Sequence, residues 1–374
     1  MGANRYPLKA TCSTLPAMDP HAESDHASAG EPPRAGPLGR CPVSLLLGLG
    51  LILVVEALLL VDVQMRGGAV VPPLLPPPSG LLQELARHVA VNVTPLCWVG
   101  YLLLVDGLLT WTDPSPDGRF PRGASPVRRR PRRFIVCFLV SVPVWLFFDW
   151  VNFSFIHAWS YHGLPESIVH RYVGYFVAFG AIMPAMLLTA QLYQRLGLRR
   201  LRTRGMTIGR PLQIALLGLG VVFVALPFFI RAPVATLTLW LGVLLLLDPL
   251  NHWLTPAPAP GIHHGDAVRS RSLICDWQAG RWGRTVALMA GGATCGFLWE
   301  FWNYWAAAKW TYDLPFLGPL EDYRYFEMPW VGFSGFLPFA LECWVVYQTA
   351  LLIAGRLLPR RRLVEPLPDD DAVL

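Results

Sequence analysis

The stretch WEFWNYWAAAKWTY (residues 299–312) decides the fold, because the chain repeats its pattern in DWVNFSFIHAWSY (149–161). Counted from Glu300 or from Asp149, an Asn follows at +3, a Trp at +10 and a Tyr at +12. Further matches follow each copy in the same order, Arg171-Tyr172, Pro184 and Tyr193-Gln194 in the first and Arg324-Tyr325, Pro338 and Tyr347-Gln348 in the second. Agreement of this kind predicts an internal duplication.

The composition is that of a membrane protein. Hydrophobic residues make up 53% of the chain, charged residues only 15%, and the mean hydropathy is +0.41, whereas soluble domains carry roughly 25% charge. The net charge of +6 would suggest nucleic acid as the partner of a soluble protein, but in a membrane protein basic residues first report topology. We therefore expect membrane lipid, and no nucleic acid, as a partner.

Apolar runs long enough to cross a bilayer predict an all-α, polytopic membrane protein with eight transmembrane helices, since about 20 residues span the hydrocarbon core. The expected spans are Val43–Met65, His88–Trp111, Phe134–Ala158, Tyr172–Tyr193, Pro211–Ile230, Val234–Leu250, Thr285–Ala308 and Trp330–Ala354. They divide the chain into a disordered tail (1–40), repeat I (43–195), a basic linker (196–210), repeat II (211–355) and a C-terminal tail (356–374). With four spans each, the repeats are expected to lie parallel.

The distribution of basic residues sets the predicted orientation. With eight spans and a cytoplasmic N-terminus, 25 Lys and Arg residues fall on the inner side and 6 on the outer side. Cytoplasmic segments carry such an excess of positive charge. We therefore expect both termini in the cytoplasm, and a bacterial plasma membrane as the location.

The sharpest candidates for chemistry are the two matched acids, Asp149 and Glu300, each within a predicted span. Ionisable groups are costly inside a bilayer and usually mark functional sites. Asn152 and Asn303 lie one helical turn further on, where their amides are expected to orient the acids. Glu342 lies within the last span and has no acidic counterpart in repeat I. The alternative for each acid is a structural role, bonding its helix to a neighbour.

Aromatic residues surround both acids and are the candidates for binding a substrate. They are Trp150, Trp159 and Tyr161 in repeat I and Trp299, Trp302, Trp310 and Tyr312 in repeat II. A cavity lined by rings could bind a long apolar ligand and stabilise a developing cation. Part of the set also fits an aromatic belt at the membrane interface.

Other kinds of site have no sequence support. The seven cysteines show no CxxC spacing, and no HExxH motif, P-loop, GxGxxG or GxSxG occurs. We therefore expect no disulfide framework, no metal and no cofactor.

The acid, the Trp-x-Tyr ten to twelve residues later and the proline of the final helix resemble the small membrane lycopene cyclases of carotenoid synthesis. The resemblance covers about 50 residues per repeat, and it implies two similar helical modules that act on an isoprenoid substrate through intramembrane acids. The Pro-x-Glu-Glu motif of that family is absent here: Ala-Met-Leu follows Pro184, and Phe-Ala-Leu follows Pro338, with Glu342 at +4.

Three functions follow as hypotheses. The first is an enzyme, an isoprenoid cyclase or isomerase, in which Asp149, Glu300 or Glu342 donates a proton to a lipid-soluble substrate. The second is a transporter of protons or small molecules that uses the same acids. The third is a membrane scaffold without turnover.

Overall fold

The computed structural model describes residues 41–69, 79–112, 125–255 and 272–357, and it is mostly helical. The predicted disordered tail (1–40) and nearly all of the predicted C-terminal tail lie outside the described residues. The long helices are α1 (Val43–Met65), α3 (Val93–Trp111), α5 (Pro131–Val151), α6 (Ile168–Arg195), α7 (Arg210–Ile230), α8 (Ala235–Leu254), α10 (Gly283–Trp305) and α11 (Phe336–Leu357). Short helices α2 (Leu81–Val91), α4 (Pro126–Arg129) and α9 (Leu273–Gln278) accompany them, with a π-helix η1 (Asn152–Ile156) and the 3-10 helices η2 (Leu198–Arg200), η4 (Pro315–Glu321) and η5 (Trp330–Gly335).

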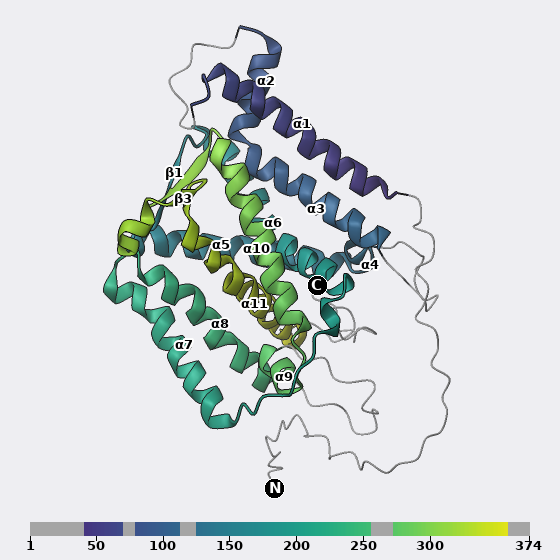
Figure 1. The fold of residues 1–374 in the computed structure, drawn as a ribbon, viewed down its shortest axis with the longest axis vertical. Helices are drawn as coiled ribbons and strands as arrows, with labels where there is room; N and C mark the ends of the chain where they lie inside the picture. Colours follow the sequence, from purple (N-terminus) through teal and green to yellow (C-terminus); the bar gives the residue numbers. More distant parts are fainter. Residues whose placement is uncertain (1–40, 70–78, 113–124, 256–271, 358–374) are drawn as a thin grey trace.

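Two outer helix pairs flank a central group of four helices. The pair α1 and α3 lies on one side, the pair α7 and α8 lies on the other, and α5, α6, α10 and α11 lie between them (Figure 1). The packing partners correspond: α3 packs on α6 as α8 packs on α11, and α5 packs on α6 as α10 packs on α11. The correspondence is incomplete, because α10 also packs extensively on α6, whereas α5 barely contacts α11.

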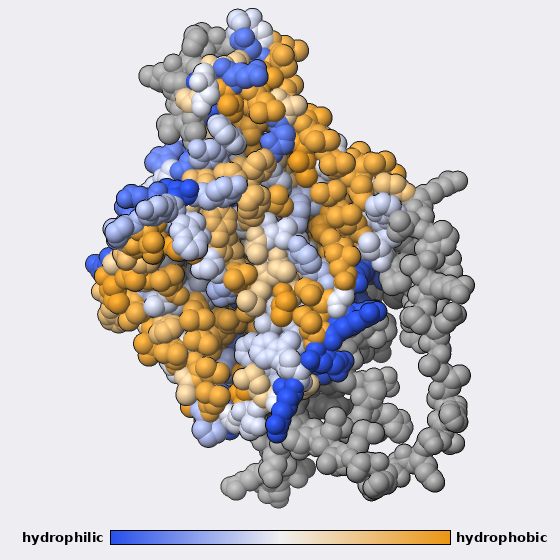
Figure 2. Space-filling model, in the orientation of Figure 1, coloured by the Kyte–Doolittle hydropathy of each residue, from blue (hydrophilic) through white to orange (hydrophobic). Residues whose placement is uncertain are grey.

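The exposed sides of the long helices are apolar, as is typical of a membrane protein. Figure 2 shows apolar residues over their exposed sides, and hydrophilic residues gathered toward opposite ends of the bundle. Among the described residues, seven helices are long and apolar enough to cross a membrane. The fold therefore defines a multi-pass α-helical membrane protein.

The predicted seventh span corresponds to α10, which is not among those seven helices although it is 23 residues long. It contains Arg284 and Glu300, and more than half of its residues are buried. Because other helices surround α10, packing rather than lipid sets its composition. Eight spans remain a prediction.

Glycines let α10 approach its neighbours closely. A Cβ on Gly292 would lie 2.2 Å from the carbonyl oxygen of Phe336, at the start of α11. A Cβ on Gly291 would lie 2.9 Å from the carbonyl oxygen of Met186 on α6. Small residues at such crossings are the usual means of helix association in membranes, and they explain how α10 fits at the centre.

The expected span boundaries differ from the observed helix boundaries at several points. The run starting at His88 is broken at Asn92, whose side-chain amide donates to the His88 carbonyl oxygen at 2.8 Å, so the long helix starts at Val93. The third span leaves α-helical geometry after Val151 and ends with a π-helix at Ile156. The last expected span, Trp330–Ala354, is found as a candidate span with the same bounds, and within it the 3-10 helix η5 precedes α11, which starts at Phe336.

A small antiparallel ribbon joins the two copies of the motif, a feature that the all-α prediction did not include. Strands β1 (Trp159–His162) and β2 (Lys309–Tyr312) pair with Trp159 opposite Tyr312 and Tyr161 opposite Trp310. Exchanging the two copies of the motif leaves this register unchanged. A second ribbon, β3 (Arg324–Tyr325) with β4 (Met328–Pro329), follows near the same end of the molecule (Figure 1).

Candidate functional site

The Asp149 carboxylate receives both aromatic donors of its own motif. The indole Nε1 of Trp159 donates to Oδ1 at 3.1 Å, and the Tyr161 hydroxyl donates to Oδ1 at 3.0 Å. Asp149 is buried near the end of α5, and the two donors come from β1. The spacing of +10 and +12 in the sequence is therefore the length of chain that leaves the helix, turns at His157 and returns as a strand.

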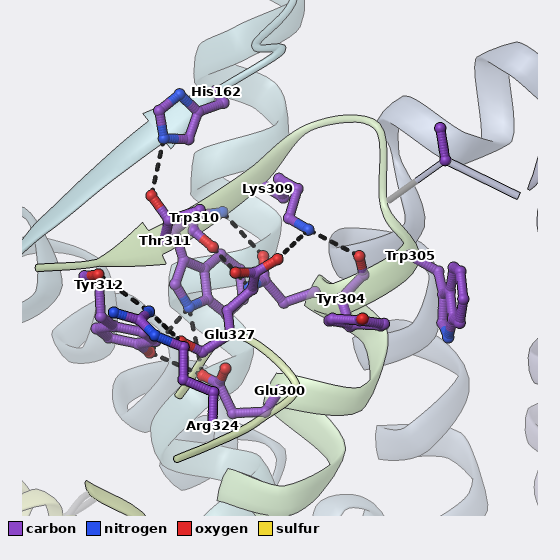
Figure 3. Close-up of polar contacts among 12 residues, drawn as sticks. His162, Glu300, Tyr304, Trp305, Lys309, Trp310, Thr311, Tyr312, Arg324 and Glu327 are labelled. Atoms are coloured by element: carbon purple, nitrogen blue, oxygen red, sulfur yellow. Dashed lines mark hydrogen bonds and ion pairs between the residues drawn. The ribbon is translucent and has the colours of Figure 1, made fainter. Parts of the chain in front are cut away.

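Glu300 receives the corresponding donors in the second copy. The Tyr312 hydroxyl donates to its Oε1 at 2.7 Å, the Trp310 indole Nε1 lies 3.3 Å from the same oxygen, and that Nε1 also donates to the Tyr312 hydroxyl at 2.8 Å (Figure 3). Glu300 is fully buried, and its other oxygen, Oε2, has no hydrogen-bond partner. The structure thus brings together acid, Trp and Tyr in each copy.

The amides of Asn152 and Asn303 contact the strands and not the acids, which corrects the expected contact. Nδ2 of Asn303 donates to the Trp310 carbonyl oxygen, and Oδ1 accepts from the Trp310 backbone N–H, both at 2.8 Å. Asn152 bonds the Trp159 carbonyl oxygen and backbone N–H at 2.8 and 3.2 Å. Antiparallel strands leave alternate residues without ladder hydrogen bonds, so each amide satisfies a strand residue and positions the Trp and Tyr that contact the acid.

Both aromatic pairs line a single cavity between the two halves of the chain. The atom-free space in this region, open solvent included, is about 1040 Å³. Its aromatic walls come from both halves and consist of Trp98, Trp145, Trp159, Tyr161, Tyr175, Phe179, Trp240, Trp299, Trp310, Tyr312, Phe336 and Phe339. Neither Asp149 nor Glu300 lines the cavity. Each acid lies behind the Trp and Tyr that contact it.

Besides the two acids and the two amides, Trp150, Trp302 and Glu342 also do not line this cavity. Trp150 is 52% exposed, and its ring contacts Phe228 on α7. Trp302 is buried and packs edge to face against Trp98. Glu342 is buried on α11, one turn beyond the cavity residue Phe339, and neither of its carboxylate oxygens has a hydrogen-bond partner. The other predicted aromatics, Trp159, Tyr161, Trp299, Trp310 and Tyr312, all line the cavity.

The two cavity phenols keep their protons. Burial first, and the nearby Asp149 and Glu300 second, raise the pKa values of Tyr161 and Tyr312 well above the ordinary value. A buried phenol beside a carboxyl is disfavoured in its charged form. Both groups therefore act as O–H donors at any physiological pH.

A buried lysine, Lys309, stabilises strand β2 in the second copy of the motif. Lys309 forms an ion pair with Glu327, and its Nζ also donates to the Tyr304 carbonyl oxygen at 2.8 Å (Figure 3). Burial lowers the pKa of Lys309, and the hydrogen bond to Glu327 opposes that effect. This pair links β2, the end of α10 and the segment before β4.

Sequence reasoning missed several cavity residues because they lie outside the duplicated motif. Trp98 on α3, Trp240 on α8 and Phe339 on α11 reach the cavity from other helices. Polar residues Asn92, Thr94, His170, Arg171 and Lys309 also line it. The one signal in the sequence was the density of tryptophan, 15 residues in the whole chain.

The fold and the cavity together define a multi-pass membrane protein with an aromatic-lined site. No protein-family model, curated protein or solved structure matches the chain.

Proposed function

We propose that this protein is a membrane enzyme that acts on a lipid-soluble, isoprenoid-like substrate by proton transfer. The observation that carries the proposal is that two matched clusters of acid, Trp and Tyr converge on one aromatic cavity. An apolar cavity with a few polar groups is the usual form of a small-molecule site. An isoprenoid chain would fill the cavity, and its double bonds would lie against aromatic rings.

The proposed chemistry starts with proton delivery by one cluster. Glu300 in its protonated form would supply the proton, and Tyr312 would relay it in one concerted step: the hydroxyl proton passes to a carbon–carbon double bond as the Glu300 proton passes to the phenol oxygen across their 2.7 Å contact, so no phenolate forms. The carbocation that forms would be stabilised by the faces of rings such as Trp299 and Trp310. The π electrons of a second double bond in the substrate form a new carbon–carbon bond to the cation and close a ring. A C–H proton beside the new cation then passes to the Asp149 carboxylate by way of Tyr161, which restores a double bond. One proton is gained and one is lost, so the product has the mass of the substrate.

The proposal also covers the membrane topology of the chain and its family. We propose eight spans in two parallel four-helix repeats, with both termini in the cytoplasm of a bacterial cell and kinship with the membrane lycopene cyclases. Support comes from the corresponding helix contacts and from the symmetric register of β1 and β2. The missing Pro-x-Glu-Glu motif means that the Tyr and acid clusters, not that motif, would carry the chemistry.

The buried position of Glu342 favours a second candidate function, proton-coupled transport. Its buried carboxylate has no hydrogen-bond partner, and carboxylates within membrane helices commonly mark proton pathways. Transport would appear as a pH-dependent flux in vesicles that Glu342→Gln abolishes. An enzyme without transport would show no such flux.

The test of the leading proposal is the lipid that purifies with the protein in mild detergent. Gly174 lines the cavity, and a Cβ there would meet open space, so Gly174→Phe would place a ring in the cavity. The control is Gly218→Phe, at a helical glycine on the exposed side of α7 whose Cβ would also meet open space. We expect a bound polyene or prenyl lipid in the wild type and the control, but not in Gly174→Phe.

The variant Glu300→Gln then separates catalysis from binding. Because cyclisation leaves the mass unchanged, substrate and product must be distinguished by chromatographic retention and absorbance. We expect Glu300→Gln to retain an isomer of the lipid that is found in the wild type. If the same lipid occurs in both proteins, or if only bulk phospholipid is found, the enzyme proposal fails.

A further inference from the structure

The cavity lining includes a group of polar residues, called the rim below, that the proposed proton chemistry does not use. The rim residues are Asn92, Thr94, His170, Arg171 and Lys309, which come from the break between α2 and α3, the first turn of α6 and β2. The described residues that line the cavity include no Asp or Glu. The rim therefore combines hydrogen-bond donors with positive charge.

Arg171 supplies the rim's positive charge. Its Nε and Nη2 donate to the Pro165 carbonyl oxygen at 3.0 and 2.8 Å, which fixes the guanidinium at the start of α6. Within the described part of the chain Arg171 forms no ion pair, whereas Lys309 is paired with Glu327. A guanidinium has five N–H donors, so several remain for an anion.

The neighbouring rim residues are held in place before any ligand binds. The His170 ring Nε2 lies 2.9 Å from Oδ1 of Asn92, and the His170 ring stacks on His88 with centroids 5.9 Å apart. The hydroxyl of Thr94 is buried at its oxygen and has no hydrogen-bond partner. The rim thus offers an anchored cation.

The cavity extends from this rim toward the middle of the bundle. On α6 the lining residues run from His170 to Ile182, a distance of about 18 Å at 1.5 Å per residue. Beyond the rim the walls are aromatic and aliphatic. The shape and chemistry fit a molecule with a charged head and a long apolar chain.

We propose that the cavity binds a lipid with an anionic headgroup, a prenyl phosphate by chemical class, with the phosphate on Arg171 at the rim and the chain among the aromatic rings. This inference rests on the proposed function and specifies its substrate class. Arginine suits phosphate because its fork of donors matches the phosphate oxygens. A pure hydrocarbon such as a carotene would leave the rim without a partner.

The test is a titration of the purified full chain in detergent, followed by tryptophan fluorescence. The probes are farnesyl phosphate, farnesol and inorganic phosphate, and the variants are Arg171→Gln, Arg171→Lys and the control Arg231→Gln. Arg231 is an exposed arginine in the turn between α7 and α8 that does not line the cavity.

We expect the wild type and Arg231→Gln to bind farnesyl phosphate about tenfold more tightly than farnesol, since a hydrogen bond to a charged group is worth about that factor. Arg171→Gln should lose the preference and still bind farnesol, which shows that the cavity is intact. Arg171→Lys, which keeps the charge, should keep part of the preference.

Three results would overturn the inference. They are equal affinity of the wild type for phosphate and alcohol, an unchanged preference in Arg171→Gln, or a response to inorganic phosphate as strong as that to the lipid. Binding of both prenyl probes that persists in Gly174→Phe would instead refute the cavity as the binding site. Failure of the headgroup inference and failure of the proposed function are therefore separable.

Discussion

Replacing Asn303 by Ala tests whether its amide holds the ribbon against the acid cluster. The side chain is fully buried, and it pairs with both backbone groups of Trp310 at 2.8 Å. Alanine would leave one buried N–H and one buried carbonyl oxygen without partners. Each costs about 1–3 kcal/mol, so we expect the free energy of unfolding to fall by about 2–6 kcal/mol.

The measurement is reversible unfolding in mixed detergent micelles, followed by tryptophan fluorescence. Asn152→Ala is the matched variant in the first copy, where the amide also bonds both backbone groups of a buried tryptophan. Gln64→Ala, at an exposed amide on α1, is the control, and we expect it to change stability by less than about 0.5 kcal/mol.

The reasoning would be refuted if the free energy of unfolding fell no further in Asn303→Ala than in Gln64→Ala. That result would mean that β2 is held by other contacts, and that the amide does not position Trp310 and Tyr312. A fall in the free energy of unfolding in Asn303→Ala but not in Asn152→Ala would show that β2 depends on its asparagine and β1 does not.

Two further predictions concern single buried groups. Glu342→Leu should raise the free energy of unfolding by about 1–3 kcal/mol in detergent, because it removes two buried oxygens without partners; lower stability would reveal a partner. Tyr312→Phe should reduce the slope with which the free energy of unfolding falls as the pH rises into the alkaline range. Burial raises the pKa of Tyr312, so the folded state keeps a proton that the unfolded chain releases above about pH 10, and wild-type stability falls from there upward. Tyr323→Phe, at a phenol that is 65% exposed, is the control, and equal slopes in the wild type and Tyr312→Phe would contradict the reasoning.

Long apolar segments could be predicted closely from the sequence. Val43–Met65 was expected as one span and is one helix, and the expected span Pro211–Ile230 matches α7 apart from one residue at its start. In both cases lipid-facing composition sets the helix. The break at Asn92 was not predictable in this way, because it depends on one amide that bonds a backbone carbonyl.

The candidate site could be predicted only in part. The duplicated intervals identified Asp149 and Glu300 together with the Trp and Tyr that contact them. They did not reveal the strand pairing, which joins residues about 150 positions apart, and local periodicity carries no information about such contacts. For the same reason the walls contributed by Trp98, Trp240 and Phe339 were missed.

The register of β1 and β2 has a consequence for how such a chain could have arisen. The Trp and Tyr of each strand pair with those of the other as they would pair with a copy of their own strand, Trp159 opposite Tyr312 and Tyr161 opposite Trp310. This is the self-complementary geometry of an isologous two-fold dimer. A shorter ancestral chain with one motif could have closed the same cavity with a second subunit. In the present single chain the two halves differ, because Glu342 has no acidic counterpart in the first half.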